Sequence, residues 1–463
     1  MEITRRSFLR QAGCAALGTT SIASTVWSLR AINAATAQAL GSSTEFRALV
    51  CLFLYGGNDA NNMIVPTDPS GYQTYAAARG PLGLPQNSLL PLNLVTPNGQ
   101  GRTFGLHPNM PELQSLFNND RKLALMANVG TLVEPTTSVQ YLNGTAHLPP
   151  QLFSHADQQV EWQTGWPDAP PTSGWGGRLA DLLTSFNNLD AISMSISLAG
   201  TNTFQVGRNV SEYQVSTGGP VALNGFGGHN GQIRYQAVQD LLNLPHQNLF
   251  EAEFAKITNR AITNDGLLAA ALNGVTINTP FPINSDLSDQ LQMIAKIIAA
   301  RQALGMRRQI FFCSVGGYDT HSNELASQAN LLAELSQCMS AFYQATEELN
   351  ISDRVTLFTA SDFGRTFQSN GSGADHAWGS HALVLGGSVS GGNMYGAFPT
   401  LDLNGPDDIG EGRWVPSTSV DQYSATLAKW YGVSSQTDLA TVLPNIGRFG
   451  TPDLGFMTPL PPP

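Results

Sequence analysis

Short, nearly continuous apolar runs recur along the chain, and most of them end in glycine or in a polar loop. Runs of this kind are typical of strands that are buried on both faces of a parallel sheet. The pattern therefore predicts strands at residues 48–57, 123–130, 191–200, 309–317, 354–361 and 381–387.

Helical periodicity appears between these runs and is clearest at residues 285–304 and 322–350. The second of these helices lies between the predicted strands 309–317 and 354–361. This order predicts a βαβ unit whose two strands are parallel and whose connection is right-handed. We therefore expect an α/β fold with a mostly parallel central sheet and helices on both faces.

One domain is predicted over residues 45–456. Within it, residues 201–284 are rich in Asn, Gly and Gln and have few long apolar runs. This composition predicts an insertion that covers one edge of the domain in the manner of a lid. The Pro-rich end, residues 457–463, cannot continue a helix and is predicted to be a tail.

The N-terminus has the pattern of an export signal. The stretch TRRSFLR at residues 4–10 precedes a modestly apolar run of small residues and an Ala-rich segment that ends near Ala39. This order is typical of a twin-arginine signal peptide, here residues 1–39, with an ordinary N-terminal helix as the alternative. No other stretch has the roughly 18 uninterrupted apolar residues of a membrane span. We expect a periplasmic or extracellular protein with no membrane span in the mature chain.

Charge and cysteine content narrow the range of partners. The formal net charge is −11, and it becomes −14 without residues 1–39, which carry four arginines and one glutamate. Such an acidic surface disfavours nucleic acid and anionic lipid. Beyond Cys14, the cysteines are Cys51, Cys313 and Cys338, and the first two lie in apolar strand-like runs. This placement predicts buried free thiols in preference to a disulfide or a metal site.

Acidic residues and histidines follow or precede several of the predicted strands. In an open parallel sheet, ligands bind beyond the carboxyl ends of the strands, so we expect these side chains to meet. Carboxylates and imidazoles suit a divalent ion such as Zn²⁺, Mn²⁺ or Ca²⁺, or a two-metal centre, and arginine suits a tetrahedral oxyanion. The candidates are Asp59, Asp319, His321, Asp362, Arg365, Asp375, His376 and His381.

Each candidate also has a purely structural interpretation. The Asp-x-His pair at 319 and 321 could cap the following helix, and Asp59 could be a turn residue after two glycines. Asp362 and Arg365 could form an ion pair within one loop. All of these residues lie at strand ends, and this shared position favours a common metal site. Without such a site, each separate structural interpretation would have to be correct.

The order of these motifs resembles one family. Gly-Gly-Asn-Asp after the first strand, FSHADQQVEWQTG, Asp-Thr-His, Ser-Asp-Phe-Gly-Arg-Thr and Asp-His-Ala-Trp-Gly-x-His are similar to the twin-arginine-exported family called domain of unknown function 1501. That family is grouped with the alkaline phosphatase and sulfatase superfamily. The resemblance covers nearly the whole mature chain and implies an alkaline-phosphatase-like fold.

The superfamily pattern also implies roles for particular residues. By this resemblance two metal ions, or a single ion at a degraded site, would be bound by carboxylates and imidazoles. The implied ligands are Asp59, Asp362 and His376 for one ion, and Asp319, His321 and His381 for the other.

A nucleophile is implied as well, because superfamily hydrolases resemble one another in a hydroxyl or thiol at a helix N-terminus. Ser154 is the best candidate, although a capping box with Asp157 is an alternative role for it. Arg365 would clamp the oxyanion. The sulfatase signature Cys-x-Pro-x-Arg is absent from the sequence.

Two functions are consistent with these features. The first is an exported metal-dependent hydrolase of phosphate or sulfate esters, with a substrate such as an extracellular polymer. The second is a non-catalytic exported protein that binds a carbohydrate or a protein partner on the same scaffold. The metal content of the purified protein separates the two.

Overall fold

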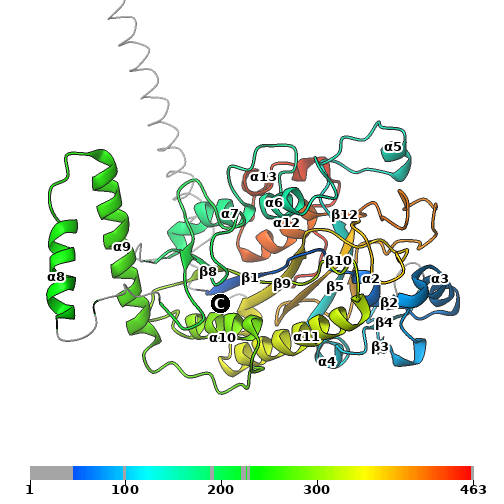
Figure 1. Cartoon of the computed structure of the whole chain (residues 1–463), viewed down its shortest axis with the longest axis horizontal. Coiled ribbons are helices and arrows are strands. Elements are labelled where there is room, and N and C mark those ends of the chain that lie inside the picture. The colour runs from blue at the N-terminus through cyan, green and yellow to red at the C-terminus, as the bar shows by residue number, and fades with distance from the viewer. Residues whose placement is uncertain (1–44, 97–100, 188–191, 221–225, 227–229, 460–463) are drawn as a thin grey trace, which may run out of the picture.

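The computed structural model describes residues 45–96, 101–187, 192–220, 226 and 230–459. In this part of the chain a central sheet lies between two layers of helices (Figure 1). The predicted signal peptide lies outside the described residues. Within those residues, no helix combines the length and the apolar character that crossing a bilayer requires.

The strands of the central sheet are short at its edges and long at its centre. They are β1 (Arg47–Leu54), β5 (Leu123–Gly130), β6 (Ser195–Ser197), β7 (Tyr213–Gln214), β8 (Arg308–Val315), β9 (Val355–Ser361), β10 (Ser380–Gly386), β11 (Met394–Tyr395) and β12 (Thr418–Ser419). Their order is β11-β5-β10-β9-β1-β8-β6-β7, and β12 pairs with β5. Within the described part of this central sheet, only the pairs that β10 forms with β5 and β9 are antiparallel. The predicted fold class, a mostly parallel α/β sheet, is confirmed.

Each predicted apolar run contains an observed strand, although the run 191–200 is reduced to β6. The predicted helices are present as α10 (Asp286–Ala299) and α11 (Glu324–Glu348). β8 and β9 are both parallel to β1, which lies between them. The predicted βαβ unit therefore exists, and its connection passes over one strand.

Side-chain alternation along β1 builds a core on each face of the sheet. Ala48, Val50 and Leu52 belong to one core, whereas Leu49 and Phe53 belong to the other, and all five are fully buried. The first core is covered by α10, α11 and α4 (Pro111–Asn118). The second is covered by α6 (His155–Thr164), α7 (Trp175–Leu183), α12 (Val420–Tyr431) and α13 (Gln436–Val442) (Figure 1).

The three described cysteines lie inside these layers. Cys51 is on β1, Cys313 is on β8 and Cys338 is on α11. All three are buried free thiols, which confirms the prediction. Burial raises the pKa of Cys338 to about 11, so this thiol stays protonated at neutral pH.

Smaller elements surround the two ends of the sheet. A second sheet, in the order β2-β4-β3, lies beside α2 and α3. Its strands and these helices are β2 (Ile64–Pro66), β3 (Leu90–Leu92), β4 (Phe104–Leu106), α2 (Ala60–Met63) and α3 (Pro69–Arg79). A short helix, α5 (Ser138–Leu142), lies on a peripheral loop.

The segment predicted as an insertion, residues 201–284, contains β7 and two helices, α8 (Gly231–Leu242) and α9 (Leu249–Leu272). These helices project from the end of the sheet that carries β7, and α2 lies at the opposite end of the molecule (Figure 1). The segment is therefore located at the β7 edge and not over the strand ends near α2.

Candidate metal centre

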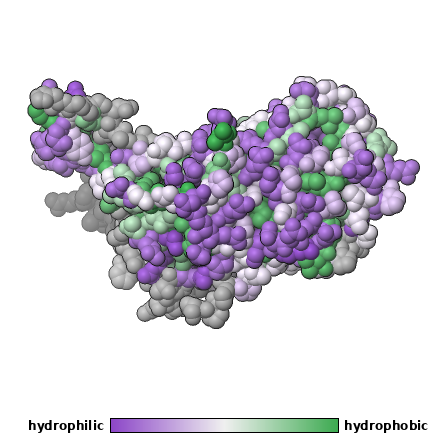
Figure 2. Space-filling model, turned by 90° about the horizontal axis from the view of Figure 1, so that it is seen from below, coloured by the Kyte–Doolittle hydropathy of each residue, from purple (hydrophilic) through white to green (hydrophobic). Residues whose placement is uncertain are grey.

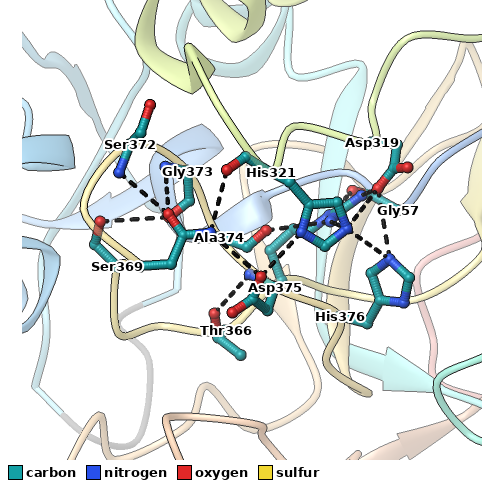
Figure 3. Close-up of polar contacts among 12 residues, drawn as sticks. Gly57, Asp319, His321, Thr366, Ser369, Ser372, Gly373, Ala374, Asp375 and His376 are labelled. Atoms are coloured by element: carbon teal, nitrogen blue, oxygen red, sulfur yellow. Dashed lines mark hydrogen bonds and ion pairs between the residues drawn. The ribbon is translucent and has the colours of Figure 1, made fainter.

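Three histidines and one aspartate meet at the carboxyl end of the sheet. Asp319 and His321 follow β8, His376 precedes β10, and His155 is the first residue of α6. Nε2 of the three rings lies 3.1 Å (His321), 3.5 Å (His376) and 3.6 Å (His155) from Oδ1 of Asp319. The four side chains are between 24% and 48% exposed, so solvent can reach them. We name these four residues the His3Asp cluster; Figure 3 shows three of them.

In each of the three histidines, the other ring nitrogen lies within hydrogen-bonding distance of a protein oxygen. The pairs are Nδ1 of His155 with Oδ2 of Asp362 at 2.7 Å, Nδ1 of His321 with Oδ1 of Asp375 at 2.9 Å, and Nδ1 of His376 with the carbonyl oxygen of Phe153 at 2.8 Å. An oxygen acceptor requires the ring proton to be on Nδ1, which leaves a lone pair on Nε2 in the neutral ring. Three lone pairs therefore point toward one carboxylate oxygen.

This arrangement fits a bound cation. Nε2 of His321 and Nε2 of His376 lie 2.9 Å apart, where two lone pairs repel each other unless a proton or a cation lies between them. Nε2 of His155 is buried and has no hydrogen-bond partner among the described residues, which is unusual for a buried polar atom. Ligand atoms of His155, Asp319 and His376 lie within 4.8 Å of one another. Imidazole nitrogen with carboxylate oxygen is an ordinary ligand set for Zn²⁺.

The charges around the cluster favour the forms that bind a metal. Burial alone would raise the pKa of Asp319, but the hydrogen bond and positive charge of Arg365 lower it below the ordinary value. Burial lowers the pKa of His376, and the charge of Arg365 lowers it further, against the effect of the Phe153 carbonyl. A carboxylate and a neutral imidazole are thus the favoured states, and a divalent cation requires these states of its ligands.

Arg365 itself is fully buried, and its guanidinium donates to protein oxygens on every side. The oxygen acceptors are Oδ1 of Asp319 and the carbonyl oxygens of Gly56, Gly57, Tyr318 and Ala374, and Nη1 also lies 3.4 Å from Nε2 of His321. These bonds join the loops that follow β1, β8 and β9. The geometry therefore gives Arg365 a positioning role in place of the predicted oxyanion clamp.

Asp362 lies behind His155, and its side chain is fully buried. Its Oδ2 accepts hydrogen bonds from Nδ1 of His155 and Nε2 of Gln159, and its Oδ1 accepts one from the backbone N–H of Gly56. Carboxylates in this position orient a metal-ligating histidine through its second nitrogen. The structure thus gives Asp362 an orienting position, whereas the sequence predicts a direct ligand.

Two further predicted ligands are directed to protein partners. Asp59 is fully buried, forms an ion pair with Arg79 and accepts the N–H of Asn61 at 3.0 Å. Nδ1 of His381 accepts the backbone N–H of Asn128 at 3.0 Å. Burial lowers the pKa of His381 to about 4, so its ring is neutral. The fold therefore does not assemble the two ligand sets that the resemblance implies.

The cluster and the loops around it lie largely in a region that sequence comparison identifies. Residues 254–435 match the family model described as "Protein of unknown function (DUF1501)". The predicted resemblance to the DUF1501 family is confirmed over this part of the chain, which contains Asp319, His321, Asp362 and His376. A search of curated proteins gives no match.

Several solved structures are similar in fold to this chain at low identity. Ps i-CgsB in complex with k-i-k-neocarrahexaose has a TM-score of 0.36 and 9% identity, and the match covers 88% of this chain and 78% of that one. PsFucS1 sulfatase from Pseudoalteromonas sp. has a TM-score of 0.33 and 11% identity, with coverages of 81% and 69%. The C-terminal periplasmic domain of EcEptC from Escherichia coli has a TM-score of 0.35 and 11% identity, with 88% of each chain covered.

The start of α6 lies outside the region that matches the DUF1501 model, and it supplies both a cluster residue and the predicted nucleophile. Ser154 is the N-cap residue of α6, but its side chain makes no capping hydrogen bond. Its hydroxyl instead donates to Oδ2 of Asp157. The role of Ser154 as a nucleophile stays a prediction. His155 is a cluster residue that strand-end reasoning misses, and the Ser-His pair at a helix start is the sequence signal that points to it.

Proposed function

We propose that this protein is a metal-dependent hydrolase of phosphate or sulfate esters and that its reaction takes place at the His3Asp cluster. The observation that supports this most is the convergence of three Nε2 lone pairs on Oδ1 of Asp319 at a partly exposed position. A divalent ion bound there would polarise an ester oxygen and lower the pKa of a bound water. Zn²⁺ suits this ligand set best, because three of the four ligands are imidazoles.

The chain's own residues fix the geometry and provide a candidate nucleophile. Asp362, Asp375 and the Phe153 carbonyl keep the ring protons on Nδ1, and Arg365 holds Asp319. In the proposed reaction, Oγ of Ser154 attacks the phosphorus or sulfur atom while its proton passes to Asp157, to which the hydroxyl already donates. The bond to the leaving alcohol oxygen breaks, and this oxygen takes the proton from Asp157. Water then hydrolyses the serine ester, which restores the Ser154 hydroxyl and releases phosphate or sulfate.

The proposal includes export through the twin-arginine pathway, with action in the periplasm or outside the cell on an ester-bearing polymer. The paired arginine at residues 5–6 and the small-residue run after it support this location. Export of a folded chain would allow the metal to be bound before transport. A non-catalytic binding protein on the same scaffold is the competing function, and it requires no bound metal.

The decisive experiment is elemental analysis of protein purified without chelator. We expect about one divalent ion per chain. His376→Ala and His155→Ala should each lower the bound metal at least tenfold, because each removes a ligand. His147→Ala is the matched control, since His147 is an exposed histidine outside the His3Asp cluster, eight residues before His155, and the change should leave the metal content unchanged.

Turnover of an aryl phosphate and an aryl sulfate then tests catalysis. Asp319→Ala should abolish turnover while circular dichroism shows a folded protein. Metal-free wild-type protein that stays metal-free after incubation with Zn²⁺ or Mn²⁺ would exclude the hydrolase and favour the binding protein. Wild-type activity in Asp319→Ala would remove the His3Asp cluster from the mechanism.

A further inference from the structure

Exposed large apolar side chains are concentrated on the projecting helices α8 and α9. In the described part of the chain, the exposed ones that belong to this segment are Ile233, Leu241, Leu244, Leu249, Phe250, Phe254, Ile257 and Leu267. The two helices bury few of their own residues: α8 buries only Gly231, which has no side chain, and α9 buries Ala255, Asn264 and Leu268. Most helices in proteins are stabilised by packing of an apolar face, so an exposed face of this kind indicates an interaction surface.

The most exposed of these residues form one row along α9. Phe250, Phe254, Ile257 and Ala261 are separated by four, three and four residues, the spacing that aligns side chains along one side of a helix. The side chains of Phe250, Phe254 and Ile257 belong to residues that are 85%, 68% and 57% exposed. We name these four residues the α9 row. In Figure 2 the projecting helices lie at the left of the view, with apolar residues on their surface.

The α9 row faces away from α8. Ala252, Ala255 and Asn259 are more buried than the row and lie on the other side of α9. Nδ2 of Asn259 reaches Oδ1 of Asn243, the residue that ends α8, at 3.4 Å. Because α8 occupies that side, the row is left for a partner outside the described chain.

We propose that the α9 row binds the same row of a second copy of this chain, with the two α9 helices antiparallel about a twofold axis. Identical subunits most often associate through such a self-complementary surface. With the axis between Phe254 and Ile257, Phe254 of each copy contacts Ile257 of the other. Phe250 of each copy then lies opposite Ala261 of the other.

The charges beside the row are complementary in this antiparallel arrangement. Glu253 and Arg260 lie on the same flank of the row, one on each side of its midpoint. The twofold axis therefore brings Glu253 of each copy close to Arg260 of the other. Arg260 forms no ion pair with the described residues, and Glu253 contacts only the exposed Lys256, at 3.3 Å.

A cavity beside Ile257 and Ala261 of the α9 row can accommodate Phe250, the most exposed side chain of the row. The cavity has a volume of about 350 Å³ and lies between α9 and the β7 edge of the sheet. Ile257, Arg260 and Ala261 line it from α9, and Ile192 and Tyr213 line it from the sheet side. Since Phe250 of the second copy lies opposite Ala261, its ring can enter this cavity. One antiparallel arrangement thus places Phe250 at the cavity and Glu253 beside Arg260. An unrelated apolar partner would not explain this agreement.

Light scattering coupled to size exclusion, over a range of protein concentrations, tests the proposal on the full chain. We expect the mass of two chains for the wild type and of one chain for Phe254→Asp. Ile283→Asp is the matched control, because Ile283 is 85% exposed but lies outside α8 and α9, and this variant should keep the mass of two chains. Circular dichroism confirms that each variant is folded.

Charge exchange tests the register. Glu253→Arg should weaken the dimer about tenfold, because it sets two arginines against each other on each side of the axis. Adding Arg260→Glu should restore the wild-type dissociation constant. A wild-type protein that has the mass of one chain at every concentration would overturn the proposal, and so would a dimer that Phe254→Asp leaves intact. A one-chain protein that binds lipid vesicles through Phe254 would assign the row to a membrane surface instead.

This inference does not depend on the proposed hydrolase activity. The α9 row lies at the opposite end of the molecule from α2 and the strand ends that carry the His3Asp cluster (Figure 1). Phe254→Asp should therefore retain the metal content of the wild type. If Phe254→Asp lowers the mass to one chain but keeps the metal content, the result supports the dimer and says nothing about the hydrolase.

Discussion

Asp59 and Asp319 follow neighbouring parallel strands, and each is paired with a buried arginine, yet their surroundings differ in one decisive respect. The side chain of Asp59 is fully buried, whereas that of Asp319 is 48% exposed. Arg79 binds both Asp59 and Glu324, and no solvent reaches these three side chains. Residue type and strand end are the same for the two aspartates, so burial and the available partners decide which one can meet a ligand.

The charges of the buried group formed by Asp59, Arg79 and Glu324 are balanced without a bound metal. Burial alone would raise the pKa of Asp59, but the charge of Arg79 and hydrogen bonds from Glu324 and Asn61 lower it. Burial and the negative charge of Asp59 raise the pKa of Glu324 to about 10. At neutral pH the group thus holds one carboxylate, one guanidinium and one protonated carboxyl. Such a group stabilises the loop after β1 without a bound cation.

The largest expected effect is on folding stability. Asp59→Ala should lower the free energy of unfolding by about 3–5 kcal/mol, because it leaves Arg79 buried without its carboxylate partner. Asp319→Ala should lower it by less, since the Asp319 side chain is half exposed and Arg365 keeps its four backbone carbonyl acceptors. Urea unfolding of both variants, followed by circular dichroism, measures the difference. Unchanged stability of Asp59→Ala together with a loss of bound metal would place Asp59 in the metal site and reverse the comparison.

The same contrast between buried and exposed side chains separates His381 from the cluster histidines. The pH dependence of the unfolding free energy can show it. The buried ring of His381 has a pKa of about 4 in the folded protein, compared with an ordinary value of 6.5. The unfolded chain therefore takes up this proton first, and the stability that depends on a neutral ring is lost as pH falls from 6.5 toward 4. His381→Asn keeps an acceptor for the N–H of Asn128 but cannot be protonated.

We expect the loss of unfolding free energy between pH 7 and pH 5 to be smaller in His381→Asn by about 2 kcal/mol. Urea unfolding at the two pH values, compared with the wild type, measures it. The variant should also retain the bound metal, because His381 lies outside the His3Asp cluster. An equal loss in variant and wild type would show that His381 is not neutral in the folded protein.

The sequence predicts the strands well because each central strand is buried on both faces and reads as an unbroken apolar run. Such a run has no direction, so the antiparallel orientation of β10 is not predictable from it. Strand ends bring Asp319, His321, Asp362 and His376 to one edge, as expected. The separate fate of Asp59 depends on Arg79, whose place is set by α3, a helix outside the strand pattern.

The place of His155 in the His3Asp cluster is not predictable from the sequence for a related physical reason. It enters the cluster from α6, which packs over the face of the sheet, so no rule about strand ends applies to it. Its ring direction depends on Asp362, which is more than 200 residues away along the chain. Contacts of this kind exist only after the layers have packed, and single-sequence patterns do not contain them.

The smallest expected effect compares the carboxylates behind two cluster histidines. Asp362 is fully buried behind His155, whereas Asp375, behind His321, is 46% exposed. Asp362→Asn should weaken metal binding by about tenfold or more, because the amide can present its N–H groups to Nδ1 and no water can replace the lost acceptor. Asp375→Asn should weaken it by less, because water can accept the His321 proton at that exposed position.

Competition with a chelator at fixed pH measures both affinities, and Asp453→Asn, at an exposed aspartate near the C-terminus, is the control. Equal effects of the two substitutions would mean that burial does not separate these carboxylates, and the contrast drawn from Asp59 and Asp319 would not extend to the residues that orient the ligands.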